Sequence, residues 1–81
     1  SLKVDNPSEN QTVNSLTVEV RGETDPNATL SINNEQVSIN SDGNFKKEIT
    51  VFPGDTSINF QVENRFGRVT AKKVKILVKP N

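Results

Sequence analysis

Residues 16–21 read Leu-Thr-Val-Glu-Val-Arg, so an apolar side chain stands at every second position. In a β-strand, successive side chains point to opposite faces of the sheet, and this stretch therefore has one apolar and one polar face. Similar alternation recurs in residues 29–32, 37–39, 45–51, 58–62 and 69–78, and a short version opens the chain at 2–4. The sequence thus predicts seven short strands and no amphipathic helix.

The composition of the 81 residues also favours a folded, all-β chain. Val, Ile and Thr together number 22, whereas Ala and Leu together number six. β-Branched side chains pack well on a pleated surface, and a helical protein would use Ala and Leu more heavily. Leu, Ile, Val and Phe make up 28% of the chain, above the level of about 20% below which disorder is expected.

Turn residues separate the predicted strands at intervals of about 8–12 residues, which is typical of a β-sandwich. Asn33-Asn34 and Asp42-Gly43 predict hairpin turns, because Asn and Gly tolerate a positive φ. Pro7 cannot donate a hydrogen bond to a neighbouring strand, which predicts an edge position for the first strand.

The last segment contains a change of parity. Its apolar residues carry odd numbers up to Ala71 and even numbers from Val74 onwards. A β-bulge near Lys72-Lys73 would bring both sets onto one face, so we expect a bulge there.

The turn residues and short strands resemble those of a bacterial immunoglobulin-like family, known as domain B of glucodextranase and as modules of surface proteins. The resemblance extends from about Leu16 to Val78. It consists of Val-Arg-Gly-Glu-Thr-Asp-Pro at 20–26, Ala-Thr-Leu-Ser-Ile-Asn at 28–33, Asp-Gly-Asn-Phe at 42–45, Pro-Gly at 53–54 and Asn-Arg-Phe-Gly at 64–67. Antibody-type and fibronectin type III domains match less well, because the paired cysteines, the core Trp and the Tyr are missing.

The resemblance implies a fold and a setting. The fold is an all-β, seven-stranded, antiparallel Greek-key immunoglobulin-like β-sandwich, and residues 1–81 form one such domain, cut from a longer multi-domain protein. The setting is extracellular or at the bacterial cell surface. Such modules are spacers, scaffolds or adhesion units, and the family has no catalytic residues to transfer to this chain.

The missing residue types exclude much chemistry. The chain has no Cys, His, Trp, Tyr or Met, so neither a thiolate nor an imidazole can act as nucleophile, base or metal ligand. Glu19, Glu48 and Glu63 fit solvent-facing strand positions rather than a pair of catalytic carboxylates. We therefore expect no enzyme activity, no cofactor and no metal site. The lack of Cys fits both a reducing cytoplasm and an exported protein without disulfides.

Charge is uneven along the chain although the net charge is zero. Residues 65–81 contain six basic residues and no acidic one. These candidate polyanion-binding residues are Arg65, Arg68, Lys72, Lys73, Lys75 and Lys79. They could bind a polymer such as a cell-wall polyanion, or the lysines could simply keep an exposed strand from pairing with other strands. Nucleic acid is disfavoured, because only Phe could stack on bases and the pI is about 6.2.

Three further features have both a functional and an ordinary interpretation. Asp25 and Asp42 could bind calcium, but each is explained by its turn, and neither turn supplies the several carboxylates that calcium needs. Lys47 interrupts the core face of its strand, which is compatible with an isopeptide bond to an Asn or Asp. A lysine at the rim of the sheet is the simpler interpretation. Phe52 and Phe66 lie beside turns, where they could stack on sugars or cap the core.

We therefore expect a non-catalytic immunoglobulin-like module that acts as a spacer or scaffold in a bacterial surface or secreted protein. Its partners would be the neighbouring domains of the same chain, and the isolated domain would be monomeric. The alternative is an adhesion module that binds a polyanion, a carbohydrate or a cell-surface ligand through its basic last strand or turn tips. We expect no nucleic-acid partner and no membrane insertion.

Overall fold

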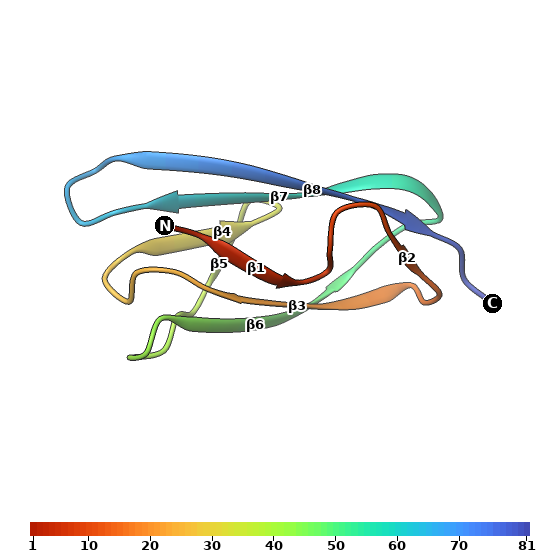
Figure 1. Ribbon diagram of the computed structural model, residues 1–81, viewed down its shortest axis with the longest axis horizontal. Helices are drawn as coiled ribbons and strands as arrows, with labels where there is room; N and C mark the ends of the chain where they lie inside the picture. The colour runs from red at the N-terminus through yellow and green to blue at the C-terminus, as the bar shows by residue number, and fades with distance from the viewer.

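The computed structural model describes all 81 residues, and its regular structure consists of eight β-strands. They are β1 (Lys3–Asn6), β2 (Gln11–Val13), β3 (Thr17–Glu23), β4 (Thr29–Ile32), β5 (Glu35–Val37), β6 (Asn44–Thr50), β7 (Gly54–Glu63) and β8 (Val69–Val78). The strands form a three-stranded sheet in the order β1-β3-β6 and a five-stranded sheet in the order β2-β8-β7-β4-β5. The two sheets face each other in Figure 1, which confirms the predicted all-β sandwich.

The eighth strand, β2, lies in a polar stretch that we expected to contain no strand. It pairs in parallel with the end of β8, from Gln11↔Ile76 to Val13↔Val78. Only Val13 of this strand is buried, so β2 lacks the alternation that marks the other strands. Its conformation comes from pairing with β8 rather than from its own sequence. All other strand pairs are antiparallel, as predicted.

Two of the local predictions are confirmed. Asn33 and Asn34 both have positive φ, at 50° and 68°, and they join the antiparallel strands β4 and β5. Strand β1, which ends just before Pro7, lies at an edge of the three-stranded sheet.

The predicted hairpin at Asp42-Gly43 is wrong, although the turn itself forms. Gly43 has φ of 86° and donates a backbone hydrogen bond to the carbonyl of Asn40 at 2.9 Å. The flanking strands, however, belong to different sheets. The turn therefore carries the chain across the sandwich instead of folding it back on itself.

One hydrophobic core lies between the sheets. Its 14 buried residues are Val13, Val18, Val20, Leu30, Ile32, Val37, Phe45, Val51, Ile58, Phe60, Val62, Val74, Ile76 and Val78. Phe45 of β6 and Phe60 of β7 meet across the core, with ring centroids 6.5 Å apart. These two strands belong to different sheets, so this pair of rings joins the layers. The predicted core faces of residues 16–21 and 58–62 are confirmed, except that Leu16 is 48% exposed.

A glycine replaces the apolar residue at the next inward position of β3. A Cβ at Gly22 would lie 2.1 Å from the backbone oxygen of Lys3 and 2.7 Å from Cζ of Phe45. Gly22 therefore lets β1 pair with β3 while the ring of Phe45 fills the space beneath.

The predicted β-bulge near Lys72-Lys73 is wrong. The register of β7 with β8 continues without interruption from Gly54↔Val78 to Glu63↔Val69. The odd-numbered Val69 and Ala71 lie on the outer face and are exposed. A bulge is unnecessary, because this half of β8 lies away from the core and even its inward-facing residues, Thr70 and Lys72, are exposed.

The molecule is elongated, with extents of 42 × 20 × 18 Å. In Figure 1 the N-terminus lies in the half that contains the β7–β8 turn, and the C-terminus lies at the opposite end. The fold includes no helix that could span a membrane.

Burial depth should decide the cost of truncating a leucine. Leu30 is fully buried, whereas Leu16 is 48% exposed. We expect Leu30→Ala to lower the free energy of unfolding by about 2–5 kcal/mol, and Leu16→Ala, its matched control, to lower it by less than about 1 kcal/mol. Urea titration followed by circular dichroism measures both, and equal losses would contradict the assigned core.

Candidate functional site

The six basic residues singled out in the sequence all lie on β8 or next to it. Arg65 and Arg68 are in the β7–β8 turn, Lys72, Lys73 and Lys75 are on β8, and Lys79 follows it. A ten-residue strand is about 33 Å long. The structure therefore spreads these charges along one edge of the sandwich instead of gathering them into a compact patch.

The three lysines of β8 do not all point to the same face. Lys73 and Lys75 share the outer face with Val69 and Ala71, whereas Lys72 points to the side of the core. The positive charge therefore surrounds the edge of β8 on both faces. Lys79 is set apart at the end of the strand, where its backbone N–H donates to the carbonyl of Val13 at 2.8 Å.

These six cations differ from the other four in the chain, because none of them forms an ion pair. Each of the remaining basic residues lies within 4.0 Å of a carboxylate: Lys3 pairs with Asp5, Arg21 and Lys46 with Glu19, and Lys47 with Glu35. The charge asymmetry of the sequence thus remains in three dimensions. No carboxylate oxygen lies within 4.0 Å of a side-chain nitrogen of these six residues.

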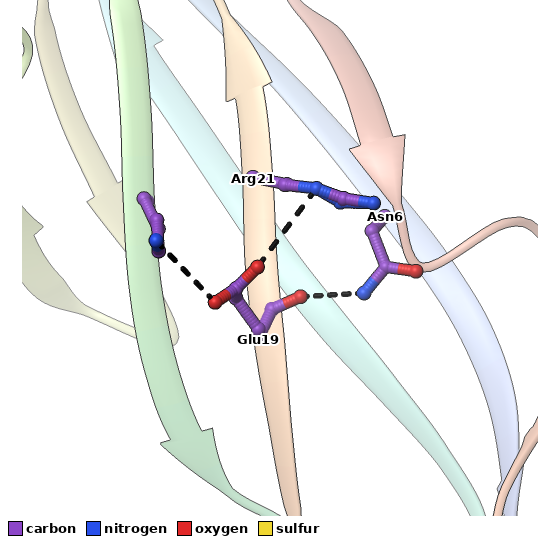
Figure 2. A network of polar contacts seen from close by, with 4 residues as sticks. Asn6, Glu19 and Arg21 are labelled. Atoms are coloured by element: carbon purple, nitrogen blue, oxygen red, sulfur yellow. Dashed lines mark hydrogen bonds and ion pairs between the residues drawn. The ribbon is translucent and has the colours of Figure 1, made fainter.

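Figure 2 shows that two cations of the three-stranded sheet contact the same carboxylate. The carboxylate of Glu19 on β3 lies 3.9 Å from Nε of Arg21 and 3.7 Å from Nζ of Lys46. The side-chain N–H of Asn6 donates to the backbone oxygen of Glu19, which links β1 to the same group. These contacts are exposed and long, so they add little stability, but they balance charge on this face.

Two turns with the same hydrogen-bond pattern shape the end of the molecule that contains Arg65 and Arg68. In Asn64–Arg68, Oδ1 of Asn64 accepts from the N–H groups of Phe66 and Arg68, each at 2.9 Å. Asn40 binds the N–H groups of Asp42 and Asn44 in the same way, again at 2.9 Å. Both turns have Gly at the fourth position, with φ of 83° and 86°. The Asn-x-x-Gly pattern therefore reflects turn chemistry rather than a ligand site.

The contacts of Asp25 and Lys47 bear on the calcium and isopeptide interpretations that we did not favour from the sequence. Oδ1 of Asp25 accepts from the N–H of Asn27 at 2.9 Å, the turn role that we favoured. Nζ of Lys47 lies 3.4 Å from a carboxylate oxygen of Glu35, and its side chain is 39% exposed, as expected for a lysine at the rim. No group of three or more Asp, Glu, His or Cys side chains lies close enough together to hold a metal ion.

The turn phenylalanines do not cap the core. Phe52 is 77% exposed and Phe66 is 80% exposed. The guanidinium of Arg65 lies 5.0 Å from the ring centroid of Phe66, within the range of a cation–π contact. The two rings lie in loops at opposite ends of the sandwich, and position in a turn was the only sequence signal for their exposure.

The largest hollow on the surface is an open groove of about 510 Å³ on the three-stranded sheet. Asp5, Arg21 and Lys46 line it, together with the segment 38–40. The two cations already contact Glu19, and Asp5 is the one carboxylate in the lining. The lining thus contains no pair of carboxylates of the kind that glycoside hydrolysis uses.

Comparisons with known proteins agree with this geometry. Residues 1–80 match the family model for glucodextranase, domain B. The chain belongs to this family. The resemblance noted in the sequence is therefore confirmed over nearly the whole chain rather than only from residue 16 onwards.

Solved structures support the fold. One similar structure contains the fibronectin(III)-like modules of Clostridium thermocellum CbhA, with a TM-score of 0.67, 16% identity, and coverage of 99% of this chain and 98% of that one. Another is CopC from Methylosinus trichosporium OB3b, with a TM-score of 0.59, 15% identity, and coverage of 100% and 96%. A search of curated protein sequences found no match. At these identities the likeness shows a shared sandwich architecture.

In this member of the glucodextranase domain B family, the two Asn-x-x-Gly turns should contribute measurably to stability. Replacing Asn64 or Asn40 by Ala removes one acceptor of two backbone N–H groups. We expect each variant to lose about 1–2 kcal/mol of unfolding free energy. Asn14→Ala is the control, because the Asn14 side chain is exposed and forms no hydrogen bond. Chemical denaturation tests this, and an Asn64→Ala midpoint equal to that of Asn14→Ala would refute the assigned turn role.

Proposed function

We propose that this chain is a non-catalytic module that spaces and presents neighbouring domains in an exported bacterial protein. Membership in a family named for one domain of glucodextranase supports a modular role, as does the likeness to fibronectin(III)-like modules. The absence of His and Cys also favours a non-catalytic role. In this proposal residues 1–81 are one domain of a longer chain, and the domain acts outside the cytoplasm as a monomer.

The placement of the two ends is the observation on which the spacer proposal depends. The chain enters in one half of a 42 Å long body and leaves at the opposite end. A domain with this geometry adds length between its neighbours, whereas a domain with adjacent ends would project sideways from the chain.

The terminal strands are also arranged to resist tension. β1 is paired with β3, and β2 is paired in parallel with β8 from Gln11↔Ile76 to Val13↔Val78. The hydrogen bonds from Asn10 to Lys75 and from Lys79 to Val13 extend the second pairing on both sides. Tension between the ends pulls these strands along their length, so their hydrogen bonds bear the force together rather than one after another.

Single-molecule force spectroscopy can test the spacer proposal with two pulling directions. We expect the domain to unfold at a markedly higher force when it is pulled by its two ends than when it is pulled through cysteines introduced at Ser15 and Asn81. Ser15 follows β2, so the second geometry peels β8 from β2 one hydrogen bond at a time. Thermal unfolding of the cysteine variant controls for lost stability. Equal forces in both directions would count against a load-bearing spacer.

A second candidate function is binding through β8, in which Arg65, Arg68, Lys72, Lys73, Lys75 and Lys79 contact an anionic ligand. The observation that favours it is the lack of any ion pair at all six residues. Contacts of this kind between exposed charges weaken as salt rises, because the Debye length falls to about 8 Å at physiological ionic strength.

The salt dependence of binding separates the two candidates. If β8 is a binding surface for anions, polyphosphate should bind the domain at low ionic strength, and the affinity should fall steeply as NaCl is added. Isothermal titration calorimetry measures this. If polyphosphate does not bind even at low salt, the spacer function remains without the second one.

A further inference from the structure

We propose that the free edge of β8, from Val69 to Lys73, docks an extended acidic peptide segment of a partner as an added β-strand. This inference deepens the second candidate function, binding through β8, and is independent of the spacer role. It names the recognised partner as an acidic strand rather than a polymer of negative charges.

The first observation is that the two halves of β8 differ on the side away from β7. The end of the strand is covered by β2, whose pairing runs from Gln11↔Ile76 to Val13↔Val78. The chain then leaves this edge, because residues 3–6 form β1 in the other sheet. No strand occupies the position in line with β2 beside Val69–Lys73.

The second observation identifies which backbone groups are free. The N–H of Lys75 binds Oε1 of Glu9 at 2.9 Å and its carbonyl accepts from Asn10 at 2.7 Å, so both groups point away from β7. Backbone groups of successive residues in a strand point to opposite sides, and those of Val69, Ala71 and Lys73 therefore point to the same open side. The residue of β7 that faces Lys73 supports this assignment. This residue is Asn59, and its N–H and carbonyl bind Asn33 on the β4 side, so they do not bind Lys73.

The third observation concerns the side chains that flank this edge. Val69 is 50% exposed, and Thr70, Ala71, Lys72 and Lys73 are also exposed. An incoming strand would lay alternate side chains beside those of β8 on each face. Acidic residues fit beside Lys72 on one face and Lys73 on the other, and an apolar residue fits beside Val69.

Charge decides against a second copy of this chain as the occupant. The edge of β8 carries unpaired Lys72 and Lys73, so two copies of β8 would repel each other. The edge strands of the two sheets are β1, β2, β5 and β6, and each of them is short or carries lysines of its own. An acidic strand would be attracted to Lys72 and Lys73, which repel a second copy of β8. The same two lysines would therefore prevent self-pairing and select the ligand.

The test uses a blocked seven-residue peptide with two adjacent Glu residues, which point to opposite faces of an added strand, a Val four positions from the farther Glu, and Thr elsewhere. Backbone amides are followed by NMR. In the free domain we expect fast hydrogen exchange at Val69, Ala71 and Lys73 and slow exchange at Val74, which faces β7. Saturation with the peptide should slow exchange at the three edge amides. Polyphosphate is the comparison ligand, because it can satisfy the charges without supplying backbone hydrogen bonds.

Two kinds of variant separate strand pairing from charge attraction. Ala71→Pro removes one edge donor and leaves every hydrogen bond to β7 in place, since the N–H of Ala71 points outward; Ala71→Ser is its control. We expect the proline variant to bind the peptide about tenfold more weakly or worse and polyphosphate as before. The charge reversal Lys72→Glu with Lys73→Glu should abolish binding of both ligands, whereas Lys46→Glu on the other sheet should alter neither.

Several results would overturn the proposal. Peptide binding that leaves the exchange of Val69, Ala71 and Lys73 unchanged would show charge attraction alone, and so would unchanged affinity in a folded Ala71→Pro domain. If that variant does not fold, the exchange measurement on the unaltered domain still decides. Binding of polyphosphate without any binding of the peptide at millimolar concentration would reject the strand and keep the anion-binding function. Binding of neither ligand would reject both.

Discussion

This structure depends on one constraint: each of the two sheets must bury one of its faces against the other sheet. The chain has no cysteine, so no disulfide can hold the layers together. Fourteen buried side chains form a single cluster, and the contact between Phe45 and Phe60 joins the two sheets within it. A shift of one residue in the pairing of a strand would move its buried side chains to the outer face and out of this cluster. The register of each strand is fixed for that reason. The register in turn decides which lysines of β8 face outward.

The same constraint explains why the surface can carry function without threatening the fold. Outward-facing side chains of β8 contribute little to the core, so Lys73 and Lys75 can change without disturbing the packing beneath them. On the three-stranded sheet the corresponding cations share Glu19, whereas on β8 they have no carboxylate partner. The sandwich therefore has one face on which cations and carboxylates are paired and one edge, along β8, on which the cations form no ion pair.

The sequence predicted the strands whose side chains alternate, because alternation is a direct consequence of burying one face. It also predicted the turns at Asn33-Asn34 and Asn64–Gly67, where the backbone requires residues that tolerate positive φ or accept N–H groups. It did not predict β2, which is polar and becomes a strand only because β8 lies beside it. The false bulge arose from the assumption that every apolar residue of the last strand must be buried, whereas Val69 lies beyond the core.

The candidate site was predictable in part. The six basic residues were visible as a run of charge, but their lack of ion pairs and the free backbone edge depend on where β1 and β2 pair, which local patterns do not specify. The whole account requires that Phe45 and Phe60 meet between the layers. A two-dimensional NOE spectrum tests this most directly: we predict cross-peaks between the ring protons of Phe45 and Phe60, whose centroids are 6.5 Å apart. A folded, well-dispersed spectrum without those cross-peaks would contradict the sandwich described here.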